Sequence, residues 1–146
     1  MRLIATVPLI LIPIEFDGYH VMVQGAINHK PANLLIDTGA SRSVFDQDGI
    51  RHYLQSAEFE DNERLSTGLG TNTMPTMVTT IGSISIGDFE VRNYQAILID
   101  LVHVHQSYQE LDLPKIDGVI GGDILLKHKA VINYKNKTLK LYDYKR

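Results

Sequence analysis

The 146-residue chain contains no cysteine. This absence excludes a disulfide framework, a thiolate nucleophile and any zinc site built on sulfur, and it fits a reducing compartment. The chain also lacks a run or stripe of basic residues that could contact phosphates, and its formal net charge is −3 with acids and bases mixed. We therefore expect no nucleic-acid partner.

A long apolar segment is missing as well. The apolar run Leu3–Ile12 is interrupted by Pro8 and followed by Pro13. It is too short to span a bilayer, and it lacks the small-x-small cleavage site of a signal sequence. A short signal sequence remains the alternative, but β-branched residues punctuated by prolines favour an edge strand. We expect no membrane partner and a cytoplasmic location.

Two familiar hydrolase motifs are absent. The chain has neither the H-E-x-x-H pattern of zinc peptidases nor the G-x-S-x-G elbow of serine hydrolases. Its length suits one domain with a single core, so we expect residues 1–146 to form one unit.

Most of the remaining pattern indicates β-strands. A hairpin is predicted over Val21–Ile36 around Asn28–Pro31, because apolar runs flank turn residues there. Short helices are predicted near Gln47–Leu54 and Asp123–Lys127, and a loop with a helical turn over His103–Leu113. Further strands are predicted over Met77–Ile81, Ser83–Ile86, Tyr94–Leu101, Ala130–Tyr134 and Thr138–Tyr144.

The chain runs twice through a similar order of elements. Val21–Phe45 gives a hairpin, a buried strand that ends in Asp37, and a turn. Ile81–Leu126 gives a hairpin, a buried strand that ends in Asp100, a longer loop and a helix. The repeat is degenerate, but it predicts a single all-β lobe with internal pseudo-symmetry.

The most informative motif is the segment from Leu34 to Ser41, which reads Leu-Leu-Ile-Asp-Thr-Gly-Ala-Ser. An aspartate at the end of an apolar strand is costly to bury without compensating groups. Thr38 offers a hydroxyl just beyond Asp37, and Gly39 offers an unhindered backbone N–H and allows a sharp turn. We therefore predict Asp37 as a catalytic carboxylate.

With its second motif, the chain resembles the retropepsin-like aspartic proteases. That family pairs Asp-Thr-Gly-Ala/Ser with a downstream apolar-apolar-Gly segment, which is Val119-Ile120-Gly121 here and is followed by Gly122–Leu126. The resemblance covers Val21–Tyr144. It implies a closed β-barrel lobe with one or two short helices, in which the following residues support the active site: Thr38, Gly39, Ala40, Val119, Ile120 and Gly121.

The resemblance also implies the chemistry. Two nearby carboxylates share one proton and activate a water molecule, with no metal or cofactor. Only one Asp-Thr-Gly occurs, and Leu-Val follows Asp100 instead. A homodimer that joins two Asp37 residues is therefore the better source of the second carboxylate. In the family, chain termini build the dimer sheet, for which Leu3–Ile12 and Thr138–Tyr144 are suitable.

Three further assignments follow from position. Ser66–Pro75 falls where the family has its flap, so Gly68, Leu69 and Gly70 are predicted to contact substrate; an ordinary glycine-containing hairpin is the alternative. His103 and His105 would face the same way on a strand and could bind a metal, but we favour solvated histidines. Asp123 could pair with a base at the dimer interface or act as a helix N-terminal charge.

The expected function is therefore an aspartic endopeptidase that acts on polypeptides. The alternative is a catalytically silent member of the same fold that binds peptides or serves in assembly. The intact motif favours the enzyme, because a buried aspartate without a task would be a liability.

Overall fold

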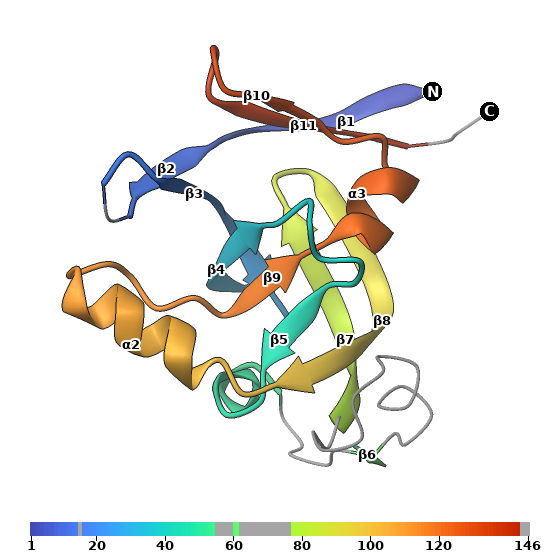
Figure 1. Ribbon diagram of the computed structural model, residues 1–146. Coiled ribbons are helices and arrows are strands. Elements are labelled where there is room, and N and C mark those ends of the chain that lie inside the picture. Colours follow the sequence, from blue (N-terminus) through green and yellow to red (C-terminus); the bar gives the residue numbers. More distant parts are fainter. Residues whose placement is uncertain (15, 55–59, 62–76, 144–146) are drawn as a thin grey trace.

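The computed structural model describes residues 1–14, 16–54, 60–61 and 77–143, most of which lie in strands (Figure 1). One sheet closes into a barrel, because β3 pairs with both β4 and β7. The predicted closed barrel is thereby confirmed. Around the ring the order is β3 (Tyr19–Ile27), β4 (Lys30–Ile36), β9 (Gly118–Ile120), β5 (Val44–Asp46), β8 (Phe89–Ile99) and β7 (Met77–Ile86).

Two hairpins form most of the barrel wall. At the β3–β4 turn, Asn28 and His29 have φ of 48° and 68°. Positive φ at both central residues is the type I′ geometry that matches the twist of paired strands. The β7–β8 turn uses Gly87 with φ of 58°, and the strands pair from Met77↔Leu98 to Ile86↔Phe89. Both predicted hairpins are confirmed.

The internal repeat is also confirmed. The inner strand of the first hairpin, β4, pairs in parallel with β9, and the inner strand of the second hairpin, β8, pairs in parallel with β5. The two short strands β5 and β9 then pair antiparallel with each other. Because β5 and β9 run in opposite directions, β4 and β8 also end at opposite ends of the barrel.

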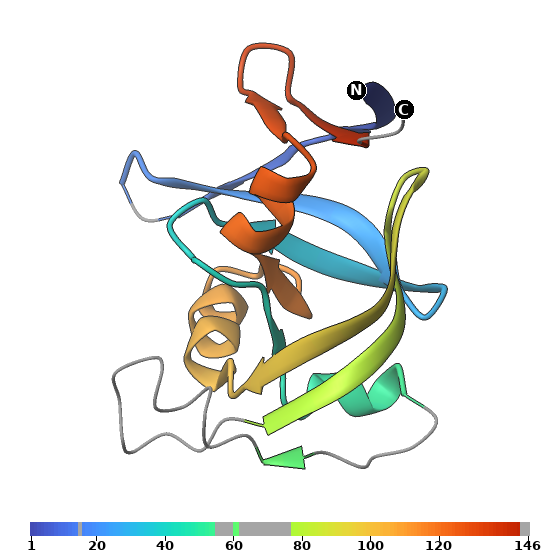
Figure 2. The same cartoon turned by 90° about the vertical axis from the view of Figure 1, so that its right-hand side faces the viewer.

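A second sheet of three strands lies across one end of the barrel (Figures 1 and 2). Its order is β1 (Arg2–Pro8), β11 (Thr138–Asp143) and β10 (Val131–Asn133). The single edge strand predicted over Leu3–Ile12 is wrong in one respect. The segment breaks at Leu9, whose N–H donates to the carbonyl of Lys137, and continues in the barrel sheet as β2 (Ile10–Pro13), beside β3.

The helical segments are a short 3-10 helix at Gly49–His52, α2 at Val102–Glu110 and α3 at Gly122–Lys127. The loop expected over His103–Leu113 is instead mainly α2, which has no glycine or proline within it. The remaining described strand, β6 (Glu60–Asp61), pairs with β7. No helix in the described part of the chain is long and apolar enough to cross a membrane.

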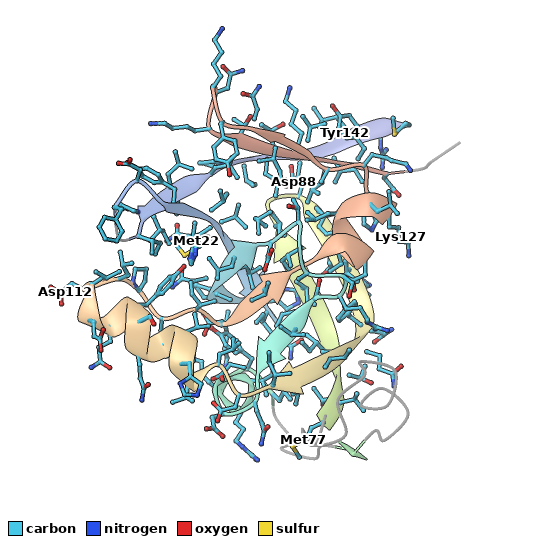
Figure 3. The ribbon with its side chains drawn as sticks, in the orientation of Figure 1. Met22, Met77, Asp88, Asp112, Lys127 and Tyr142 are labelled. Atoms are coloured by element: carbon cyan, nitrogen blue, oxygen red, sulfur yellow. The ribbon has the colours of Figure 1, made fainter. Side chains whose placement is uncertain are left out.

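The core has two parts. A large cluster fills the barrel and the space under the three-stranded sheet. A smaller cluster joins α2 to β2 and β3 through Ile12, Met22, Tyr108 and Ile116. Met22 is a residue of β3, and its side chain lies on the side of the strand that faces α2 (Figure 3). Tyr108 is 2% exposed, so α2 is held to the barrel by a buried side chain.

Candidate active site

Asp37 directly follows β4, at the barrel end that faces the three-stranded sheet (Figure 1). Its backbone N–H donates to the carbonyl of Ile120 at 3.0 Å, and its own carbonyl accepts from the Ala40 N–H at 3.2 Å. The Gly39 N–H donates to Asp37 Oδ1 at 3.0 Å. The predicted Gly39 donor is therefore present. In the single chain the Asp37 side chain is exposed rather than buried.

The apolar-apolar-Gly segment packs against the loop formed by residues 37–40, here called the Asp37 loop. Ile120 on β9 pairs with Ile36 on β4, and the Gly122 N–H donates to the carbonyl of Ala40 at 2.7 Å. A Cβ on Gly121 would lie 2.6 Å from that carbonyl oxygen and 2.8 Å from the backbone of Arg42. Only glycine at this position lets the two segments approach so closely.

A polar network missed by the sequence analysis supports the same loop. Ser43 is fully buried; its hydroxyl donates to Asp123 Oδ1 at 2.8 Å and accepts from the Gly121 N–H at 2.9 Å. The Ser43 N–H donates to the same oxygen, and the Tyr94 hydroxyl donates to Asp123 Oδ2 at 2.5 Å. The network therefore ties β8, the start of β5 and α3 together behind Asp37.

The pKa values in this network follow from its geometry. Burial raises the pKa of Asp123, but the hydrogen bonds from Tyr94 and Ser43 outweigh burial and hold it below the ordinary value. Burial, with the hydrogen bond to Asp123, raises the pKa of Tyr94 to about 12. Asp123 is thus an ionised acceptor in the first turn of α3, where a negative charge is favourable.

A hollow of about 400 Å³ opens beside Asp37. Residues of β3, of the Asp37 loop and of the β10 region surround it. His20 in this lining accepts or donates a hydrogen bond at Nδ1, 2.6 Å from the Tyr108 hydroxyl on α2. Burial raises the pKa of Tyr108 to about 12. The side chains that line the hollow include Tyr19, His20, Asp37, Thr38, Ile132 and Tyr134.

Asp100 does not approach Asp37 within one chain. It follows β8, which ends beside Asp46 on β5, whereas Asp37 follows β4, which ends beside Ile120. These two positions lie at opposite ends of the antiparallel β5–β9 pair. Asp100 Oδ1 instead accepts from the Val102 N–H at the start of α2, at 2.9 Å.

The predicted histidines and the predicted flap residues remain to be placed. His103 and His105 lie on a helix, so they do not face the same way as they would on a strand. The ring of His105 contacts the carbonyl of Ile116 through Nε2 at 2.7 Å. No group of three or more potential metal-ligating side chains gathers within the described ranges. The predicted flap residues Gly68, Leu69 and Gly70 lie outside the described residues.

Comparison with known proteins bears on this geometry. The family model "Aspartyl protease" matches residues 23–124, which include Asp37 and the segment behind it. The chain belongs to the aspartyl protease family. A search of curated proteins gave no match.

Two solved structures that are similar to this chain have the same fold. A retropepsin-like aspartic protease from Rickettsia conorii is 18% identical with a TM-score of 0.55, and the match covers 97% of this chain and 95% of that one. The retroviral protease-like domain of Ddi1 from Leishmania major is 16% identical with a TM-score of 0.56, covering 82% and 86%. The predicted retropepsin-like fold is therefore confirmed.

Proposed function

We propose that this chain is an aspartic endopeptidase that hydrolyses peptide bonds with two Asp37 carboxylates in a homodimer. The observation that carries the proposal is the Asp37 loop itself. Its carboxylate is exposed beside a hollow and is oriented by the Gly39 N–H. The family match covers both the Asp37 loop and the Val119–Gly121 segment that supports it, which agrees with that role.

The second carboxylate comes from a second chain. Asp100, the aspartate that follows β8, lies at the opposite end of the β5–β9 pair and accepts a hydrogen bond from Val102. The exposure of Asp37 in the single chain leaves its carboxylate free to meet its own copy. A partner that covers this face would desolvate both carboxylates and favour one shared proton.

The chemistry then follows from the shared proton. The ionised carboxylate takes a proton from a water molecule, whose oxygen attacks the scissile carbonyl carbon. The protonated carboxyl donates a hydrogen bond to the carbonyl oxygen. The carboxyl that took the proton from water then gives it to the departing amine as the C–N bond breaks. Thr38, Gly39 and Ala40 form the loop that holds Asp37, and Val119, Ile120 and Gly121 support it from behind.

The test compares Asp37→Asn with Asp100→Asn on an unfolded polypeptide such as casein. We expect Asp37→Asn to abolish hydrolysis and keep the fold, because the side chain is exposed. Asp100→Asn should keep activity, because an amide oxygen can still accept from the Val102 N–H. Specific activity should fall on dilution below the dimer dissociation constant.

Three results would refute the proposal in whole or in part. Equal hydrolysis by wild type and Asp37→Asn would remove Asp37 from the chemistry. A chain that binds peptides with no Asp37-dependent cleavage would instead be the silent, peptide-binding member of the fold. Loss of activity in Asp100→Asn with a monomeric wild type would reassign the second carboxylate.

A further inference from the structure

We propose that His20 is a specificity-determining residue, and that the hollow beside Asp37 binds a long substrate side chain that ends in an uncharged hydrogen-bond acceptor, as glutamine does. This inference rests on the proposed function, because it concerns the substrate residue next to the scissile bond. The geometry that carries it is the hydrogen bond between His20, which lines this hollow, and Tyr108 on α2.

The Tyr108 hydroxyl determines which ring nitrogen of His20 carries the hydrogen. Tyr108 is 2% exposed, and burial raises its pKa to about 12, so the hydroxyl keeps its proton near neutral pH. A buried O–H needs an acceptor, and in the described part of the chain its partner is His20 Nδ1, at 2.6 Å. When Nδ1 of a neutral imidazole accepts a hydrogen bond, the ring hydrogen lies on Nε2. The network therefore assigns the tautomer with an Nε2–H donor.

This donor is held in place and can be reached by a ligand. The rings of His20 and Tyr108 are stacked, with centroids 5.8 Å apart and planes at 27°. Tyr108 is itself packed in the small core cluster with Ile12, Met22 and Ile116, so a buried side chain fixes the orientation of the imidazole. His20 is exposed, and its Nε2 has no hydrogen-bond partner among the described residues.

The remaining lining indicates the kind of side chain that fits. Most of it is apolar or aromatic and comes from Val21, Leu35, Ile36, Ile132, Tyr19 and Tyr134. A volume of about 400 Å³ is sufficient for one long side chain. A stem of methylene groups would pack against these walls, while the end of the side chain would meet the His20 donor. The Asp37 carboxylate in the same hollow disfavours a second negative charge, so glutamine fits better than glutamate.

His20 is the lining residue that distinguishes an acceptor from an apolar end. The hydroxyls of Thr38, Tyr19 and Tyr134 can rotate and either donate or accept, whereas the Nε2–H of His20 always donates. An apolar end would displace water from this donor without replacing its hydrogen bond. A single neutral hydrogen bond corresponds to a preference of about three- to tenfold in kcat/KM.

The test measures this preference with two peptide pools. Each pool has random residues around one fixed central residue, which is glutamine in one pool and methionine in the other; methionine has a similar length but no strong acceptor. The pools compete in one mixture, and mass spectrometry follows cleavage after the fixed residue. We expect the wild type to prefer glutamine about three- to tenfold. His20→Asn should abolish the preference, because its shorter side chain can accept from Tyr108 but has no donor at the place of Nε2.

Tyr108→Phe tests whether Tyr108 positions His20, and Tyr53→Phe is the matched control. Both tyrosines are buried, and burial is the main cause that raises the pKa of each to about 12. The Tyr53 hydroxyl donates to the Pro31 carbonyl at 2.9 Å, away from the hollow. Both variants should therefore lose similar stability. Only Tyr108→Phe should lower the glutamine-to-methionine ratio, because an unbonded Nδ1 lets the ring hydrogen move between the two nitrogens.

The outcomes separate this inference from the proposed function. Asp37-dependent cleavage without a glutamine preference, a preference that survives in His20→Asn, or an equal change of the ratio in Tyr53→Phe would overturn the inference alone. Binding of the same pools gives the second readout. A wild type that cuts neither pool but binds the glutamine pool more tightly, with the difference lost in His20→Asn, would support the inference and refute the proposed function. A wild type that neither cuts nor binds either pool would overturn both.

Discussion

Replacing Gly121 by alanine tests how tightly the supporting segment packs against the Asp37 loop. The added Cβ would lie 2.6 Å from the Ala40 carbonyl oxygen and 2.8 Å from the carbonyl carbon and oxygen of Arg42. These are backbone atoms, so no side-chain rotation can relieve the contact. Gly121 has φ of −110°, which alanine adopts without strain, so the effect would be steric alone.

The expected cost is that of overpacking a core, about 1–3 kcal/mol in the free energy of unfolding. For a chain of this length each kcal/mol lowers Tm by roughly 2–4 °C. The Asp37 loop must shift to make room, because Ala40 lies three residues after the carboxylate. Hydrolytic activity should therefore fall together with stability.

Urea unfolding measures the cost, and the neighbouring glycine is the control. A Cβ on Gly122 would have its nearest contact at 3.5 Å, an ordinary van der Waals distance. Gly122 begins α3, so Gly122→Ala should be neutral or more stable by up to about 1 kcal/mol. Equal stability of Gly121→Ala and Gly122→Ala would refute the reasoning.

Two more predictions concern pH. The hydrogen bonds that lower the pKa of Asp123 stabilise the fold above the ordinary value of 3.8, and this stabilisation is lost as pH falls through the lower folded-state value. The free energy of unfolding of Asp123→Asn, measured in urea, should thus fall furthest below that of the wild type near neutral pH, and the difference should become smaller below pH 3.8. A difference that does not change with pH would contradict this. We expect the kcat/KM of the wild type to be highest in mildly acidic to near-neutral solution. Ala40→Ser adds a hydroxyl donor in the residue after Gly39, so its pH optimum should be lower than that of the wild type. An unchanged or upward-shifted profile would show that position 40 does not tune the site.

Local signals predicted much of the fold. Asn28 and His29 between apolar runs indicated the first hairpin, because its turn depends on residues that accept positive φ. The prediction failed at α2, where the apolar spacing is weak and the helix depends on the buried Tyr108. The prediction also treated β1 and β2 as one strand, because no local feature assigns neighbouring residues to different sheets.

Part of the candidate site could likewise be predicted from the sequence, and part could not. Asp37 and the Val119–Gly121 segment could be recognised, since each motif is contiguous in the chain. Tyr94 and Ser43 could not, because their contacts with Asp123 join residues 29 and 80 positions apart. The hydrogen bond between His20 and Tyr108 joins residues 88 positions apart. Such contacts exist only once the barrel has closed.

The sequence by itself determined the strands, the turns and the loop that presents one carboxylate, because these depend on apolar alternation, turn residues and a contiguous motif. Tertiary structure alone decided which other groups reach that carboxylate. The antiparallel β5–β9 pair separates Asp37 from Asp100, and β11 is paired on both sides, whereas β10 pairs with β11 alone among the described residues. Strand direction and neighbour order are set by pairing between distant segments, which no local pattern specifies.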